Sequence, residues 1–137
     1  MKNLLFFIVI IFLLSSCKKD APYNPDDHIT YEHWYKVDQR THDTLYSVYL
    51  PSAFTPTNHD GINDVFYGRG YFKLKKFSVY DRQGELIFGT FDPNMHWNGR
   101  MNASGDFVQM GVYVYHYVVS DKHDLEYEYS GSVMLYK

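Results

Sequence analysis

The sequence contains a single cysteine, Cys17, among its 137 residues, so no disulfide can form within the chain. Its seven histidines are scattered, without the His-x-His or His-x₃-His spacing that is typical of zinc ligands. It has no Gly-x-Ser-x-Gly motif, and its acidic residues lie mostly in expected turns and on polar strand faces. No catalytic triad or paired-carboxylate site can be argued from these residues, so we expect a non-enzymatic protein without a zinc site.

Positive charge is also scarce, because thirteen Lys and Arg oppose sixteen Asp and Glu and leave a formal net charge of −3. Nucleic-acid binding depends largely on basic side chains that neutralise phosphates, so we expect no nucleic-acid partner. The sequence shows no amphipathic helix of useful length and no internal repeat. Aromatic residues, in contrast, are abundant, with fourteen Tyr and ten Phe. They favour pleated, half-buried surfaces and predict an all-β fold.

The N-terminus carries an export signal. Lys2 gives a positive start, and residues 4–14 form an uninterrupted apolar run, shorter than the roughly 20 residues of a membrane-spanning helix but typical of a signal peptide. The run ends in the letters LSSC at residues 14–17, which resemble the lipobox of bacterial lipoproteins. That resemblance implies cleavage before Cys17 and acylation of Cys17. We therefore expect residues 1–16 to be a lipoprotein signal peptide and the mature protein to be held on a membrane by its lipid.

Residues 17–44 separate this signal from the expected domain. Residues 18–27 contain two prolines and five charged side chains, which predicts an extended tether. Residues 28–44 are polar but carry aromatic side chains such as Tyr31 and Trp34. Two interpretations stay open for them: an extra strand, or a pad that packs against the domain.

From residue 45 onward, strand patterns follow one another, separated by turn residues every 8–12 positions, which predicts a sandwich. Residues 81–84 (DRQG) and 121–124 (DKHD) are expected turns, and Asn98-Gly99 is the dipeptide most typical of a tight hairpin. The expected strands are residues 45–50, 71–80, 85–88, 111–119 and 126–136.

One of these strands changes phase along its length. In residues 71–80, Phe72 and Leu74 share one face, whereas Phe77 and Val79 share the other. One extra residue near Lys75-Lys76 would turn all four side chains towards the core, because an inserted residue shifts the alternation by one. We therefore expect a β-bulge there.

A cluster of side-chain oxygens is found around Gly61, contributed by Asn58, Asp60, Asn63 and Asp64. Calcium takes six to eight oxygen ligands, and a glycine allows the sharp bend that a calcium loop requires. The spacing lacks the third acidic position and the terminal Glu of an EF-hand. The alternative, which we favour, is a tight turn in which these side chains bond nearby backbone amides.

Two charged residues accompany the expected turn at 81–84. Arg82 could bind the carboxylate of a partner through its planar guanidinium, with Glu85 beside it. The favoured alternative is that Arg82 pairs with Glu85 or Asp81 across the turn, an exposed contact that contributes only about 0–1 kcal/mol.

A stripe of tyrosines, Tyr113, Tyr115 and Tyr117, lies on one face of the expected strand 111–119. Such a stripe suits a carbohydrate-stacking platform or a protein interface, since aromatic residues dominate binding hot spots. The favoured alternative is a sandwich core that Tyr127 and Tyr129 complete.

Six segments carry a more specific signal when they are taken in order. They are residues 53–58 (AFTPTN), 60–66 (DGINDVF), 79–88 (VYDRQGELIF), 97–99 (WNG), 111–115 (GVYVY) and 131–137 (GSVMLYK). The ordered set resembles the gliding motility-associated C-terminal domain, also called the type B sorting domain of the type IX secretion system. The chain departs from that family at His59, Gln83 and Met110, where Gly, Trp and Pro are usual.

This resemblance implies an all-β fold, an Ig-like antiparallel β-sandwich of about seven strands, over residues 45–137. It also implies passage across the outer membrane and a porin-like outer-membrane partner. Together with the lipobox, it predicts a protein that is lipid-anchored to the outer membrane, on the periplasmic or cell-surface side. Its sandwich would dock on a porin-like protein or another type IX secretion or gliding component. The alternative function is a surface adhesin or glycan-binding accessory module that uses its tyrosines.

Overall fold

The computed structural model describes residues 29–137. The expected signal peptide, the acylated Cys17 and the tether of residues 18–27 lie outside the described residues. Within residues 29–137 there is no α-helix, only the short 3-10 helix η2 (Met101–Ala103), and this part of the chain offers no apolar helix of membrane-spanning length. The strands are β1 (Tyr31–Val37), β2 (Thr44–Pro51), β3 (Ala53–Phe54), β4 (Arg69–Tyr71), β5 (Lys73–Tyr80), β6 (Leu86–Thr90), β7 (Gly111–Ser120) and β8 (Glu126–Leu135).

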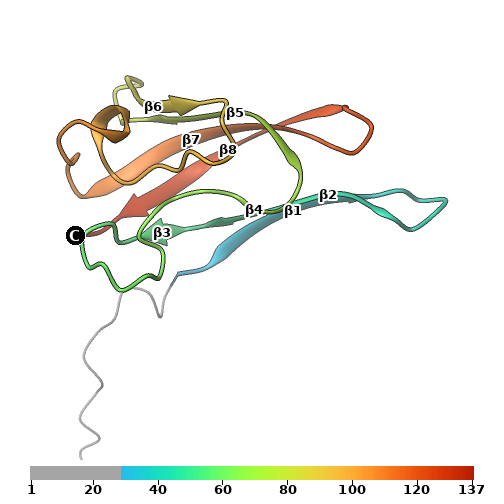
Figure 1. Ribbon diagram of the computed structural model, residues 1–137, viewed down its shortest axis with the longest axis horizontal. Helices are drawn as coiled ribbons and strands as arrows, with labels where there is room; N and C mark the ends of the chain where they lie inside the picture. The colour runs from blue at the N-terminus through green and yellow to red at the C-terminus, as the bar shows by residue number, and fades with distance from the viewer. Residues whose placement is uncertain (1–28) are drawn as a thin grey trace, which may run out of the picture.

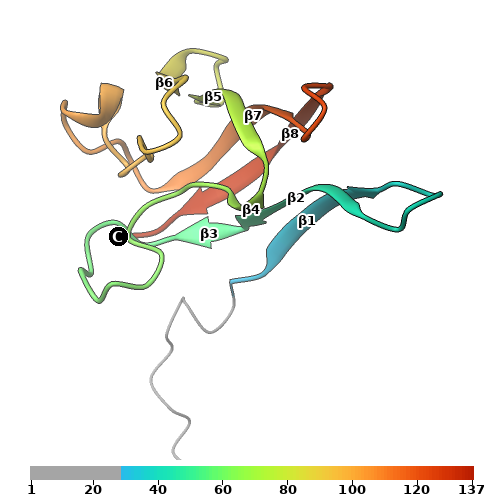
Figure 2. The same cartoon turned by 45° about the vertical axis from the view of Figure 1, so that its right-hand side comes forward.

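These strands form two sheets that face each other (Figures 1 and 2). The first sheet has the order β1-β2-β4 and the second the order β3-β8-β7-β5-β6. The predicted all-β sandwich is therefore confirmed. It has eight strands instead of about seven, and one of its pairs, β3 with β8, is parallel instead of antiparallel.

The parallel pair arises where the chain crosses from one sheet to the other. β2 ends at Pro51 and β3 begins at Ala53, so Ser52 is the crossing residue. Its N–H donates to the carbonyl of Thr30 beside β1 (2.7 Å), and its carbonyl accepts from the N–H of Met134 in β8 (2.9 Å). Ser52 thus satisfies its backbone groups on both sheets, and β3 leaves it running alongside β8.

The core between the sheets is largely aromatic. Phe54, Phe66 and Trp97 are fully buried, and the ring of Phe54 lies 5.0 Å from that of Trp97 and 5.9 Å from that of Phe66. Phe66 in turn contacts Phe77 at 5.7 Å and Tyr115 at 5.3 Å. Tilted ring pairs of this kind add about 0.5–1.5 kcal/mol each to the effect of burial alone. Trp34 of β1, whose ring lies 6.1 Å from that of Tyr115, connects this aromatic cluster to the three-stranded sheet.

The predicted β-bulge is confirmed in β5. The pairing of β5 with β7 shifts between Leu74 and Lys76, so one residue is inserted at that point. Phe77 and Val79 are fully buried, and Leu74 and Phe72 pack against the same core while partly exposed. The inserted residue therefore lets one strand present both halves of its apolar pattern to the core.

β1 precedes residue 45, where the sequence pattern places the start of the sandwich. It pairs with β2 along its whole length, and its inward side chains contact the opposite sheet. The ring of Trp34 stacks on Tyr129, with centroids 4.4 Å apart and planes 7° apart, and Glu32 Oε2 accepts a hydrogen bond from the Tyr115 hydroxyl (2.9 Å). This segment is thus a strand that also packs on the core.

The prediction of a hairpin at Asn98-Gly99 is wrong. Trp97 forms a bridge with Phe66, and Arg100 forms one with Phe107, so the chain on either side of the dipeptide does not pair with itself. Gly99 does have a positive φ of 77°, but the reason for a glycine is close packing. A Cβ at this position would lie 2.8 Å from Pro56 Cγ and 3.1 Å from Leu135 Cδ1.

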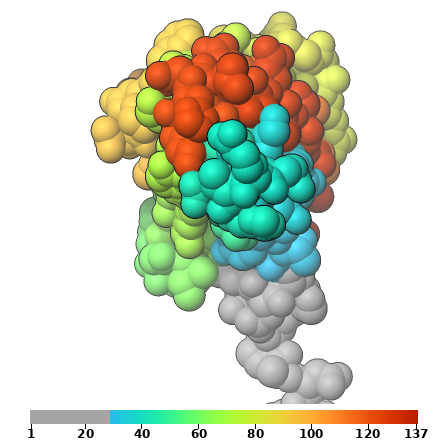
Figure 3. Space-filling model, turned by 90° about the vertical axis from the view of Figure 1, so that its right-hand side faces the viewer, coloured from blue at the N-terminus to red at the C-terminus, as the bar shows by residue number. Residues whose placement is uncertain are grey.

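At one end of the sandwich, the tips of the β1–β2 and β7–β8 hairpins lie side by side (Figure 3). Lys122 Nζ lies 3.4 Å from Asp43 Oδ2 and joins the two tips. A second ion pair, between Lys73 Nζ and Asp124 Oδ1 at 2.8 Å, joins the β7–β8 tip to β5. Both pairs are exposed, so they fix the geometry of this end more than they add to stability.

Candidate functional site

The tyrosine stripe of β7 lies in the core. Tyr113, Tyr115 and Tyr117 are 8%, 1% and 2% exposed, so their rings are not available for stacking on a glycan or a partner. The three tyrosines therefore form part of the sandwich core, the favoured alternative to a binding platform. Tyr129 and Tyr127 of β8 pack against the same core.

Each hydroxyl of the stripe has a partner inside the protein. Tyr113 donates to the carbonyl of Gln109 (2.7 Å), Tyr115 donates to Glu32, and Tyr117 accepts from the N–H of Gly68 (2.8 Å). Burial raises the pKa of all three phenols above its ordinary value, and for Tyr115 the neighbouring Glu32 carboxylate raises the pKa further. These hydroxyls are neutral structural groups at physiological pH.

The predicted oxygen cluster around Gly61 forms a turn with local hydrogen bonds. Asp60 accepts from the N–H of Ile62 (2.7 Å) and from the side-chain amide of Asn58 (2.9 Å), and Asp64 Oδ2 accepts from the N–H of Gly61 (3.1 Å). These are contacts of the kind expected for the turn interpretation.

Two further facts bear on the calcium alternative. Asn63, with a positive φ of 53°, accepts a hydrogen bond from the Tyr31 hydroxyl (3.3 Å), so its oxygen is used to join this turn to β1. Asp64 Oδ1 is buried and has no hydrogen-bond partner. Within residues 29–137 no group of three or more His, Cys, Asp or Glu side chains is arranged to hold a metal ion. The calcium site stays a prediction.

The turn between β5 and β6 is organised by Asp81. Its Oδ1 accepts the N–H groups of Gln83 (2.9 Å) and Glu85 (2.8 Å), and Gly84 has a positive φ of 86°. Arg82 and Glu85 are both exposed. In the described part of the chain neither one forms an ion pair, so the cross-turn pairing that the sequence favours does not form and the guanidinium of Arg82 stays available.

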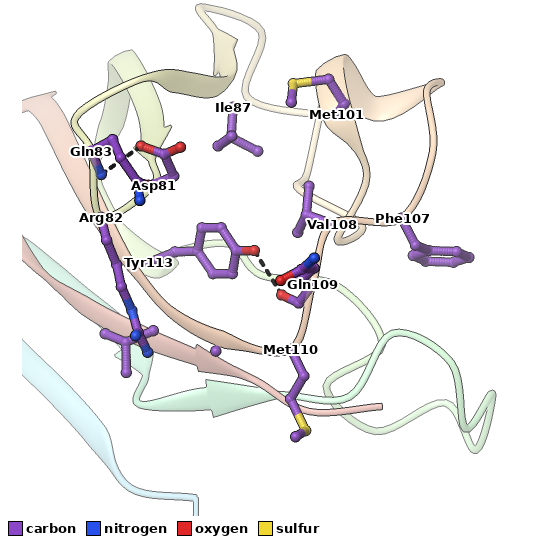
Figure 4. Close-up of a pocket in the computed structure, with 12 residues that line it drawn as sticks. Asp81, Arg82, Gln83, Ile87, Met101, Phe107, Val108, Gln109, Met110 and Tyr113 are labelled. Atoms are coloured by element: carbon purple, nitrogen blue, oxygen red, sulfur yellow. Dashed lines mark hydrogen bonds between the residues drawn. The ribbon is translucent and has the colours of Figure 1, made fainter.

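Arg82 borders a cleft of about 460 Å³ at the end of the five-stranded sheet where β5 ends and β7 begins (Figure 4). Three segments meet there: the β5–β6 turn, the loop that leads from η2 into β7, and the first residues of β7. Ile87 and Tyr113 are buried at its base, whereas Met101 and Met110 are 39% and 61% exposed at its border. The cleft thus combines these apolar side chains with the polar residues of the β5–β6 turn and Gln109.

Arg82 is the one cation that lines the cleft. Its guanidinium lies beside the start of β7, with Nη2 3.6 Å from the position that a Cβ on Gly111 would occupy, and Figure 4 shows its side chain extending along one side of Tyr113. Asp81, the carboxylate beside it, is engaged by the two turn amides. This arrangement suits a ligand that presents an apolar group together with a carboxylate, which the planar guanidinium binds in a bidentate manner.

The loop that carries Met101 and Phe107 is held in place by contacts with Trp97 and Arg100. The indole N–H of the buried Trp97 donates to the carbonyl of Arg100 (3.0 Å). The guanidinium of Arg100 lies over the ring of Phe107, 3.7 Å from its centroid, and donates to the carbonyl of Gly105 (3.1 Å). The wall of the cleft is therefore a structured loop, which Trp97 and the packing of Ala103 and Val108 attach to the core.

Of the residues that line the cleft, the sequence pattern predicts Arg82 and Tyr113 as candidates but not the methionines or Val108. No periodicity connects Met101, Val108 and Met110, since they lie in an irregular segment. The only sequence signal was the departure at Met110, where the resembled family usually has Pro.

Comparisons with known proteins give one match. The model of a protein family described as the CHU_C type IX secretion signal domain matches residues 48–135, which is more than half of the chain. This confirms the resemblance found in the sequence. Among curated proteins and among solved structures, no match is found.

Proposed function

The chain belongs to the type IX secretion signal domain family, and on that basis we propose that it is a non-enzymatic lipoprotein of the outer membrane whose sandwich docks on a component of the type IX secretion or gliding machinery. Membership of the family gives the domain a sorting-related role in a cell-envelope or secreted protein. The proposal adds a lipid anchor at Cys17 and a porin-like outer-membrane partner.

The observation that carries this proposal is the cleft at Arg82. The guanidinium of Arg82 lines the same cleft as the exposed Met101 and Met110 and the buried Ile87 and Tyr113, and no acidic side chain of the described residues pairs with it. Methionine side chains are flexible and adapt to apolar partners, and arginine is enriched at binding hot spots. We infer that the partner inserts an apolar side chain between Met101 and Met110 and places a carboxylate on Arg82.

Lipidation would strengthen this docking. Acylation of Cys17 would confine the sandwich to the membrane in which the partner resides, which raises the effective concentration of one for the other without any further contact. A modest interface at the cleft would then be sufficient for a stable complex.

The alternative function, a surface adhesin or glycan-binding module, depended on Tyr113, Tyr115 and Tyr117 as an exposed platform. Because these three side chains are buried, nothing at β7 favours it, and we do not propose it.

The test is an affinity purification from native membranes in mild detergent, with the tag placed near Asn24 so that the C-terminus stays free. We expect mass spectrometry to recover a porin-like protein or a type IX secretion or gliding component. Arg82→Gln should reduce this recovery at least tenfold, and Arg82→Lys, which keeps the charge but loses the planar fork, should give an intermediate value.

The matched control is Arg40→Gln, because Arg40 is also an exposed arginine but lies in the β1–β2 turn, outside the cleft. It should leave recovery unchanged. Recovery of the lipoprotein alone, or equal recovery with Arg82→Gln, would contradict docking at the cleft. Lipidation is checked separately by labelling cells with a clickable fatty acid, which should mark the wild-type chain but not Cys17→Ser.

A further inference from the structure

The three-stranded sheet has an aromatic outer surface that the docking proposal does not use. Its register places His33, Tyr49 and Arg69 in one row across β1, β2 and β4, and Tyr35, Ser47 and Tyr71 in the next. We call the outward residues Tyr31, His33, Tyr35, Tyr49, Arg69 and Tyr71 the outer tyrosine face.

These side chains point away from the core because their neighbours in β1 point into it. Glu32 contacts Tyr115, Trp34 stacks on Tyr129, and Lys36 donates to the Tyr127 hydroxyl (3.2 Å). Alternation along a strand then sends the residues between them to the opposite side. In Figures 1 and 2 no described strand covers that side of β1 and β2.

The exposure of this face is large for aromatic residues. Tyr35 is 61% exposed, Tyr71 56%, Tyr31 46% and Tyr49 40%. Together they account for all the tyrosines among the exposed large hydrophobic side chains of residues 29–137. A contiguous exposed patch, in contrast to scattered single residues, is the kind that indicates an interaction surface.

The ring geometry indicates what kind of surface this face suits. His33 lies between two tyrosines, stacked on Tyr49 at 3.9 Å and on Tyr35 at 4.9 Å. Because His33 covers one face of each of these two tyrosine rings, that ring surface is not free for a sugar to stack on. The exposed tyrosines also present hydroxyl groups, and an apolar body with a polar tip is what places tyrosine at the boundary between lipid and water.

The charge of the face agrees with a lipid surface. Although acidic residues outnumber basic ones in the whole chain, the outward positions of β1, β2 and β4 carry Arg69 and His33 and no Asp or Glu. Arg69 lies over the ring of Tyr67, 5.0 Å from its centroid. A cation beside tyrosines and no carboxylate is compatible with the phosphate groups of a bilayer.

The position of this face in the chain also favours contact with a lipid surface. β1 begins at Tyr31, fourteen residues after Cys17, and a chain of that length spans at most about 50 Å. An acyl anchor at Cys17 would therefore keep the first strand of this face within reach of the bilayer at all times.

We propose that the outer tyrosine face lies against the lipid surface and orients the anchored sandwich. This rests on the anchor at Cys17 in the proposed function. The Arg82 cleft belongs to the other sheet, so a sandwich resting on its three-stranded sheet keeps the cleft open to a partner. The lipid surface thus fixes the direction in which the docking site points.

The experiment uses the full lipidated protein on vesicles of phosphatidylethanolamine and phosphatidylglycerol. Because Cys17 is the only cysteine and its thiol would be acylated, an introduced cysteine is the only free thiol available for a nitroxide label. We place the label at Tyr35→Cys or Tyr71→Cys on the face, and at Met110→Cys or Leu125→Cys as controls of similar exposure (61% and 59%) elsewhere on the sandwich.

The readout is the accessibility of the label to oxygen, which concentrates in lipid, relative to a water-soluble nickel chelate. We expect this ratio to be at least threefold higher at Tyr35 and Tyr71 than at Met110 and Leu125. Equal ratios at all four positions would overturn the proposal, including the case in which a glycan or a protein covers the face instead. A chain that fails to float with the vesicles would instead show that the anchor is missing.

A second measurement does not depend on the anchor. The mature chain with Cys17→Ser is incubated with the same vesicles, and its partition coefficient is compared with that of a variant that also carries Tyr35→Ser, Tyr49→Ser and Tyr71→Ser. We expect the triple variant to bind at least tenfold less, while Phe91→Ser with Leu125→Ser, at exposed positions outside this face, binds as the parent does. Equal binding by parent and triple variant, with unchanged melting temperatures, would contradict the proposal.

Discussion

Asp81 and Asp121 occupy equivalent positions in the two hairpin turns of the five-stranded sheet. Each uses Oδ1 to accept the N–H groups of the residues two and four positions later, at 2.9 and 2.8 Å for Asp81 and at 2.7 and 3.1 Å for Asp121. In both turns the fourth residue has a positive φ, 86° at Gly84 and 61° at Asp124. The turns DRQGE and DKHDL therefore share one backbone design, although only the first Asp is common to both.

The shared design predicts that Gly84→Ala destabilises the domain. A Cβ at Gly84 would meet no atom within 4 Å, so the expected cost is that of the left-handed conformation alone, about 1–2 kcal/mol. The measurement is the free energy of unfolding in denaturant. Gly89→Ala is the control, because Gly89 lies in β6 without a positive φ and its Cβ would be in ordinary contact with Leu86 at 3.8 Å. Equal losses for the two variants would contradict the turn geometry.

The second turn predicts a loss of stability in acid. Burial raises the pKa of Asp121. Hydrogen bonds from the N–H groups of His123 and Leu125 and from the Tyr127 hydroxyl lower the pKa by more than burial raises it, so the pKa lies below its usual value. A carboxyl with a depressed pKa stabilises the fold above the unfolded pKa of about 3.9, and this contribution is lost as the pH falls through the folded value.

The check is the melting temperature of Asp121→Asn between pH 3 and pH 7. Its deficit relative to the parent should be largest above about pH 4 and should shrink towards pH 3. A deficit of Asp121→Asn that stays constant with pH would mean that the charge of Asp121 is not what stabilises the turn.

The sequence predicted strands well where alternation was unambiguous. In β8 the tyrosines and Val133 alternate with Glu and Ser, so the core face is evident. In β7 the face opposite the tyrosines also carries apolar residues, Val112, Val114 and Val118, so alternation could not show which face is buried. The structure shows that the tyrosines face the core, while Val114 is 45% exposed.

The cleft could not be predicted for a different reason. Its position depends on Trp97, which pairs with Phe66 thirty-one residues earlier and thereby fixes the loop that carries Met101. Such long-range pairing leaves no periodic trace in the segment that it positions. The same pairing explains why Asn98-Gly99, a strong local hairpin signal, does not form a hairpin.

The local hydrogen bonds of the turn at Gly61 predict that calcium does not change the stability of the domain. Asp60 already accepts two hydrogen bonds within the turn, so removing its carboxylate should lower stability whether or not calcium is present. We expect a calcium titration to leave the melting temperature unchanged and Asp60→Ala to lower it equally with calcium and with chelator. Because Asp64 Oδ1 lacks a partner, a rise in the parent's melting temperature with calcium that Asp64→Asn abolishes would establish a site instead.

The last strand predicts how the C-terminus contributes to the domain. β8 lies between β3 and β7 in the five-stranded sheet, Val133 and Leu135 are fully buried, and the N–H of Tyr136 donates to the carbonyl of Phe54 (3.0 Å). Deleting residues 130–137 should therefore unfold the whole domain. Leu135→Ala, a milder change, should reduce the free energy of unfolding by about 2–5 kcal/mol.

Removing the exposed Lys137 alone serves as the control and should leave the cooperative thermal transition in circular dichroism unchanged. If residues 130–137 acted only as a linear signal, their deletion would abolish recognition by the secretion machinery while the melting curve stayed as it was, and that result would contradict the role assigned to β8. If the deletion removes the transition and Leu135→Ala weakens it, the signal is the folded sandwich, because the strand that would be read is also the strand that completes the core.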